Sequence, residues 1–393
     1  MQKMTTRILL GAMLGLLAGS AGASELIFDD GAEHVVDFDV SGDVRILNGS
    51  QVTITHEGAA ARVELIDGDL LLDGGRVEFL YQGEGSSRFR MEAGEVGALD
   101  KRGGSAVVLG GRIATYADPS PGLLGSILVA GNARVAELRV SAASITVADN
   151  GFIGGISGPF SSLSGGAVEV HGGHVGSIYF RTDAFADIVV SAGSVGSIAL
   201  VGDCSCSLSV TGGVVGSIRT RFGGVLEGGT FGPIEGGAFQ IVDGIFTGGF
   251  VSPLWDDVAY LGASIRGGTF SGPQFALLAR GADYFDLFGG EFLDPLWALD
   301  AGVFNVHGGD YAGPFVGRDD AVFNIYGSRL RYDDGHLTGW LSDGSRIGLE
   351  VALFDRASVR LVTVPEPPTY ALLALTLAGL SIVRCRSRSC GGT

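Results

Sequence analysis

A short repeat runs through most of this 393-residue chain and restricts its fold more than any other feature. The segments Val170–Ile178, Val190–Ile198 and Val210–Ile218 share the pattern Val-x-x-Gly-x-Val-Gly-Ser-Ile at a spacing of twenty residues. Further on, the repeat continues as a glycine pair followed by an aromatic residue and then a proline. This second form begins at Gly228, Gly248, Gly267, Gly289 and Gly308.

The repeat has a period near twenty residues. Each unit is counted from the apolar residue two positions before the first glycine of the pair, or from the equivalent residue. The units start at Val170, Val190, Val210, Leu226, Phe246, Ile265, Leu287, Val306 and Ile325. Weaker copies start at Leu72, Met91, Val108, Leu128 and Val147. Short alternating runs of Val, Ile, Leu and Phe with glycine between them are typical of a parallel β-solenoid at this period. We therefore predict an all-β fold, a single-stranded parallel β-helix of about 14 coils over residues 71–335, roughly 65 to 70 Å long.

Two side-chain ladders follow from this register. Phe285, Phe304 and Phe323 recur every nineteen residues and are predicted to form an inward aromatic ladder. The residues that follow them, Asp286, Asn305 and Asn324, are predicted to stack at a corner and to link coils by hydrogen bonds. The ends of such a rod need protection against edge pairing, and we assign residues 24–70 and 336–363 as its N-terminal and C-terminal caps.

Composition limits the function classes. The chain holds 67 glycines but only 11 prolines, and 46% of its residues are hydrophobic, which indicates a packed protein rather than a disordered one. Its formal net charge is -17, and it becomes about −22 once the basic residues of both terminal segments are removed. Such a surface argues against nucleic-acid binding. After Lys3 the sole lysine is Lys101, which excludes a P-loop.

The N-terminus has the features of a secretory signal peptide. Lys3 and Arg7 precede an apolar stretch from Ile8 to Ala18. Ala21 and Ala23 form an A-x-A cleavage site before Ser24, so residues 1–23 are predicted to be removed on export through the Sec translocon.

The C-terminus, residues 364–393, combines three parts in order. Val364-Pro365-Glu366-Pro367 precedes an apolar run from Tyr370 to Val383 that would form a hydrophobic helix. At about 21 Å this helix is short for a bilayer core of about 30 Å. The arginines Arg384, Arg386 and Arg388 follow and would hold that end on the cytoplasmic side.

This order resembles the PEP-CTERM sorting signal of Gram-negative bacteria. The resemblance implies that an exosortase recognises the Pro-Glu-Pro segment, cleaves near it and releases or transfers the protein to the exterior, after transient association with the inner membrane. It covers only residues 364–388. A plain C-terminal membrane anchor is the alternative.

Four cysteines form two pairs. Cys385 and Cys390 lie in the tail, which leaves Cys204 and Cys206 in the exported part. These two would face the same side of a strand, where they form either a small local disulfide or two apolar members of a core stack.

No set of residues assembles a convincing catalytic or metal site, so we assign no catalytic residue and no cofactor. Asp183 with Asp203, and Asp300 with Asp319, share positions in consecutive coils and fit a solvated corner, an acid and base pair, or a Ca²⁺ site without a motif to place it. His171 and His174 share one coil and are read as exposed turn residues rather than as a zinc site. Trp255 and Trp297 follow the repeat's proline at one offset, which favours a structural role.

These features favour a non-enzymatic, exported structural β-solenoid sorted to the cell surface or to the extracellular polysaccharide matrix of a biofilm. Extracellular polysaccharide is its candidate partner. A carbohydrate-active β-helix enzyme, resembling a polysaccharide lyase or hydrolase, and an adhesin are the alternatives.

Overall fold

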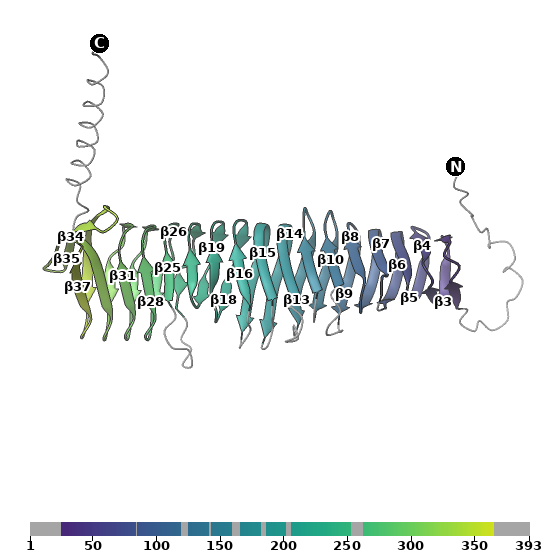
Figure 1. Cartoon of the computed structure of the whole chain (residues 1–393), viewed down its shortest axis with the longest axis horizontal. Helices are drawn as coiled ribbons and strands as arrows, with labels where there is room; N and C mark the ends of the chain where they lie inside the picture. Colours follow the sequence, from purple (N-terminus) through teal and green to yellow (C-terminus); the bar gives the residue numbers. More distant parts are fainter. Residues whose placement is uncertain are drawn as a thin grey trace, which may run out of the picture.

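The protein is a long β-solenoid (Figure 1). The computed structural model describes residues 25–83, 85–118, 125–140, 143–158, 166–181, 186–201, 206–252 and 262–364. The regular structure in these ranges is entirely β-strand, and none of it is a helix able to cross a membrane. Outside these ranges lie the predicted signal peptide and its cleavage site, the sorting segment from Pro365 onward, Asp183, Asp203, Cys204 and Trp255.

Parallel strands stack along the rod in columns, each strand pairing with its equivalents in the coils before and after it. The first column runs through the following strands: β2 (Glu33–Val36), β4 (Ser50–Thr55), β6 (Gly68–Gln82), β7 (Arg88–Lys101), β8 (Ser105–Val108), β10 (Gly125–Val129), β12 (Ala143–Val147), β14 (Gly166–Arg181), β15 (Ala186–Val201), β16 (Ser207–Val210), β19 (Gly224–Leu226), β22 (Phe239–Ile241), β25 (Gly262–Ile265), β28 (Tyr284–Leu287), β31 (Val303–Val306), β34 (Val322–Asp333) and β37 (Ser358–Thr363).

The second and third columns complete the coil. The second consists of short strands in the C-terminal half: β17 (Val214–Val215), β20 (Thr230–Phe231), β23 (Ile245–Phe246), β26 (Thr269–Phe270), β29 (Glu291–Phe292) and β32 (Asp310–Tyr311). The third contains β1 (Leu26–Phe28), β3 (Asp39–Ile46), β5 (Ala59–Leu65), β9 (Arg112–Asp118), β11 (Arg134–Val140), β13 (Phe152–Gly158), β18 (Ile218–Thr220), β21 (Ile234–Gly236), β24 (Phe250–Val251), β27 (Leu277–Ala279), β30 (Leu296–Ala298), β33 (Phe315–Gly317) and β36 (Arg346–Leu353). The long strands β6, β7, β14 and β15 bend and contribute to both the first and the third columns.

The pairing register confirms the predicted solenoid of about 14 coils from Leu72 to Ile325 and corrects two of its positions. Leu226 pairs with Ile241, and Ile241 pairs with Ile265, so Phe246 does not start a coil in this column. Phe246 lies in the second column between Phe231 and Phe270. The misassignment arose because the coil after Leu226 is short and the one after Ile241 is long. In the upstream copy Val129, not Leu128, pairs with Val108 and Val147.

The core consists of inward side chains that repeat from coil to coil. Phe285, Phe304 and Phe323 are buried, and their rings stack with centroids 5.2 and 5.5 Å apart, which confirms the predicted aromatic ladder. A second ladder that the sequence analysis did not assign fills the second column with stacked rings 4.4 to 5.0 Å apart: Phe231, Phe246, Phe270, Phe292 and Tyr311.

The predicted polar ladder is also present, but its residues lie within β28, β31 and β34 and not at a corner. The Asn305 side-chain amide donates to Asp286 Oδ1 at 2.7 Å, and the Asn324 amide donates to Asn305 Oδ1 at 2.8 Å. Each amide donor is therefore satisfied by the preceding coil, which fixes the register of β28, β31 and β34.

The two segments assigned as caps differ in structure, and the N-terminal one is built from solenoid coils. Strands β1 to β5 pair in parallel in the same columns as the repeats. At the other end β34, β35 (His336–Leu341) and β36 form an antiparallel meander. Its first turn is Asp334-Gly335, both with positive φ, and its inward residues Leu337, Leu341 and Ile347 join the core. Strand β37 then returns to pair in parallel with β34.

Candidate functional surface

The acidic pair that the structure describes lies at a turn. Asp300 and Asp319 are exposed and hold the left-handed conformation, with φ of 57° and 58°. Gly281 and Asp355, with φ of 61° and 58°, adopt the same left-handed conformation in the corresponding turns of neighbouring coils. Because Asp tolerates this conformation better than most residues, a turn requirement accounts for the repetition of the carboxylates here. The other acidic pair, Asp183 and Asp203, lies outside the described residues.

The two histidines of one coil lie apart on its surface. His171 is exposed, and its ring nitrogens contact Ser191 Oγ at 2.8 Å and Glu169 Oε2 at 3.2 Å. His174 contacts Ser194 Oγ at 2.7 Å and stacks on Phe152. Within the described ranges no group of three or more His, Cys, Asp or Glu side chains gathers to hold a metal ion.

A third histidine, which the sequence analysis did not single out, belongs to a surface stack. His307 lies between Phe288 and Tyr326, with ring centroids 4.8 and 4.0 Å away. These three residues directly follow the coil positions Leu287, Val306 and Ile325, and this shared offset was the signal in the sequence. Burial lowers the pKa of His307, while the charge of Asp286 acts in the opposite direction.

Two other residues of reactive types, a lysine and a cysteine, are buried and disulfide-bonded respectively. Lys101 is fully buried, in register with Gln82 of the previous coil, whose amide donates to the carbonyls of Ser87 and Ser105. Cys206 is disulfide-bonded, and no other cysteine falls within the described ranges. Trp297 is half-buried in the third column, in register with Leu278 and Val316.

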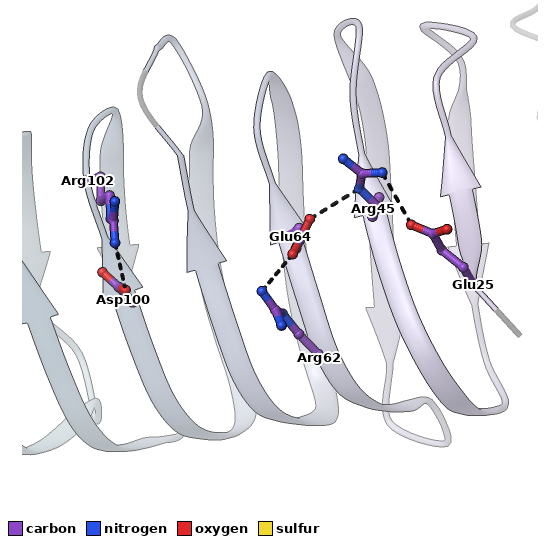
Figure 2. Close-up of polar contacts among 6 residues, drawn as sticks. All are labelled: Glu25, Arg45, Arg62, Glu64, Asp100 and Arg102. Atoms are coloured by element: carbon purple, nitrogen blue, oxygen red, sulfur yellow. Dashed lines mark hydrogen bonds and ion pairs between the residues drawn. The ribbon is translucent and has the colours of Figure 1, made fainter. Parts of the chain in front are cut away.

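Charged side chains concentrate on the outer side of the third column near its N-terminal end. Figure 2 shows Glu25, Arg45 and Glu64 on successive coils, with Arg62 beside Glu64. Arg45 reaches Glu25 at 3.3 Å and Glu64 at 3.1 Å, and Arg62 reaches Glu64 at 2.7 Å. Further along, Figure 2 shows Asp100 beside Arg102, at 3.9 Å.

Two aromatic rings lie between these charges. Phe79 and Tyr81 are half-buried on β6, two residues apart, so both point outward. The Arg62 guanidinium lies 5.7 Å from the centre of the Phe79 ring, and that of Arg102 lies 5.3 Å from the Tyr81 ring. We call this set the charged–aromatic patch: Arg45, Arg62, Glu64, Phe79, Tyr81, Asp100 and Arg102.

The patch owes its regularity to the coil register. Arg45, Glu64, Tyr81 and Asp100 occupy one outward position in four consecutive coils. Successive members are thus about 4.8 Å apart, the spacing of paired strands. Its arginine side chains are 37% to 46% exposed, whereas the Glu64 and Asp100 side chains are 20% and 24% exposed. Ion pairs this close to the surface contribute little to stability. Their availability for an external ligand is the more informative property.

Comparison of the chain with protein-family models, with curated proteins and with solved structures found no match.

Proposed function

We propose that this chain is an exported, non-enzymatic β-solenoid that an exosortase sorts to the cell surface or extracellular matrix, where it contacts polysaccharide. The charged–aromatic patch carries the second half of the proposal. Its rings offer flat apolar surface, and its guanidinium and carboxylate groups donate and accept hydrogen bonds, as sugar hydroxyls require. Repetition over consecutive coils suits a polymer, because several weak contacts on one rigid body raise the overall affinity.

The proposed sorting by an exosortase rests on the terminal segments, and a deletion tests it. Removing residues 364–393 from the full chain should abolish C-terminal processing and delivery to the exterior in a host with an exosortase. Unchanged processing and surface delivery would contradict it. If the full chain instead stays in the inner membrane and is not cleaved, the result would support a plain membrane anchor.

The patch is tested by binding of the full chain to alginate and to dextran in affinity electrophoresis, with and without Ca²⁺. The Phe79→Ala/Tyr81→Ala variant should lose at least about fivefold in retention by one or both polymers, because aromatic contacts dominate such surfaces. Tyr179→Ala is the matched control, since Tyr179 holds the same outward position on β14 and is 44% exposed. Equal losses in both variants would contradict a specific patch. Release of reducing ends from either polymer would favour the enzymatic alternative.

A further inference from the structure

The two ends of the solenoid expose strand edges. Among the described strands, β1 pairs only with β3 and β2 only with β4. At the opposite end β37 pairs in parallel only with β34. Each of these strands therefore presents a row of backbone donors and acceptors on its outer edge, and such rows readily accept another strand.

At the C-terminal end the core is partly uncovered in the first column. The first column places one apolar residue in the same inward position of every coil from Val36 to Leu361. Val36 and Ile325 are 0% exposed, whereas Leu361 is 39% exposed. Leu361 differs from the others because no described coil follows it. One more coil would bury this side chain as the others are buried.

The N-terminal end offers matching residues. Continuing the register from β37 onto β2 of another copy places Leu361 against Val36 and Arg360 beside Val35. In the third column β35 already pairs along the outer edge of β36, and the Val351 amide donates to the Gly335 carbonyl, so the continuation is confined to the first column. Leu26 is only partly buried, and its neighbours Ile27 and Val35 are 47% and 49% exposed.

Charge at the two ends is complementary. Residues 25–44 include seven carboxylates and no lysine or arginine: Glu25, Asp29, Asp30, Glu33, Asp37, Asp39 and Asp43. Arg360 is exposed in the middle of β37 and makes no ion pair with another described residue. In the continued register it lies between Glu33 and Asp37 of the other copy.

We infer that the partner at each end is a second copy of this chain, so that copies stack head to tail through β37 onto β2. A heterologous contact of this kind does not close on itself, so the product is a filament in which the first column continues from copy to copy. The inference rests on the proposed function in one respect, since processing removes residues 1–23 and the segment from Pro365 that adjoin these edges.

Disulfide trapping tests the contact. The variant is the full chain with Val35→Cys and Arg360→Cys, bearing protease sites after Ala23 and after Val364. Paired strands bring such positions within disulfide range. The two residues lie at opposite ends of the rod, so a 35–360 link can form only between copies (Figure 1). Oxidation should give covalent multimers containing this link, identified by mass spectrometry, before or after cleavage. If the 35–360 link is absent both before and after cleavage, while the strand content is unchanged, the inference is overturned.

A charge change gives an independent test with a matched control. Arg360→Glu places a carboxylate between Glu33 and Asp37 of the next copy and should weaken self-association at least about tenfold in analytical ultracentrifugation of the cleaved chain. Arg266→Glu makes the same change on an exposed residue in the middle of the rod and should leave association intact. Equal effects of the two variants would count against end-to-end stacking. Sorting in cells is a separate readout, so either proposal can fail alone.

Discussion

At the scale of single residues, the solenoid depends on places where one coil touches the next through backbone alone. The glycine of the Val-Gly-Ser-Ile pattern is such a place. A Cβ on Gly176, Gly196 or Gly216 would overlap the carbonyl oxygen of the equivalent glycine in the preceding coil. The repeated glycine in this pattern is therefore a steric requirement, and its φ is not positive at these positions.

This contact predicts the effect of a single methyl group. Gly196→Ala should lower the free energy of unfolding by about 1–3 kcal/mol, because the two coils must move apart to admit the Cβ. Gly348→Ala is the control, since a Cβ there meets no atom within 4 Å. Thermal melting followed by circular dichroism compares the two. An unchanged melting temperature for Gly196→Ala would contradict the close approach.

His307 predicts a dependence of stability on pH. Its pKa is lowered from the ordinary value of 6.5 because the folded chain buries the ring between Phe288 and Tyr326. The unfolded chain therefore takes up this proton first, so the contribution of the stack is complete above about pH 6.5 and decreases as the pH falls below it.

Replacing the ring isolates this contribution. His307→Phe keeps an aromatic ring in the stack and removes the titrating group. The drop in melting temperature between about pH 7.5 and about pH 5 should be smaller in the variant than in the parent chain. An identical drop in both chains would show that His307 does not contribute to it.

At the scale of elements, stability comes from ladders that run across many short strands. Strands of two residues, such as β26, cannot be stable alone and depend on the coils on either side. Phe270 on this strand stacks on Phe246 at 4.4 Å and on Phe292 at 5.0 Å, so it joins three coils at once.

The loss of one ring should therefore be costly. Phe270→Ala leaves a cavity between two buried rings and should cost about 3–5 kcal/mol. Phe222→Ala, at a position 40% exposed, should cost less than about 1 kcal/mol. Guanidinium denaturation of both variants measures the difference. Similar costs would indicate that the ladder does not carry the stability of these coils.

At the scale of the whole molecule, the coil is the unit of construction. Val170, Val190 and Val210 pair in sequence, twenty residues apart. Each coil contacts chiefly the coil before it and the coil after it. Removal of a whole coil therefore leaves the contacts between the remaining coils possible, whereas removal of part of a coil does not.

Deletions of different length test this. Removing residues 171–210 joins Val170 to Thr211 and takes out two whole coils. The product should fold as a rod about 10 Å shorter, as measured by small-angle scattering. Removing residues 171–180 alone leaves an incomplete coil at the join, so the coils before and after it cannot pair in register there, and the rod should not fold as one continuous body. Equal behaviour of the two deletions would contradict coil-by-coil construction.

The sequence by itself determined the class of fold, the coil period, the Phe285 aromatic ladder and the Asn305 polar ladder. It could do so because a repeat forces equivalent residues into one register, and a column of identical contacts is visible as a spacing. Where the spacing changes, equivalent positions cannot be identified from it, as at Phe246 and Leu128.

Only the tertiary structure decided the rest. In the charged–aromatic patch, Arg45, Glu64, Tyr81 and Asp100 share one position in successive coils. Arg62 and Arg102, whose guanidinium groups lie near the rings, come from other positions that this spacing does not identify. The Phe231-to-Tyr311 ladder and the open end at Leu361 likewise depend on which strand lies beside which. The physical reason is that a repeat fixes contacts between equivalent positions, whereas the faces, corners and ends of the rod bring together residues that are not equivalent.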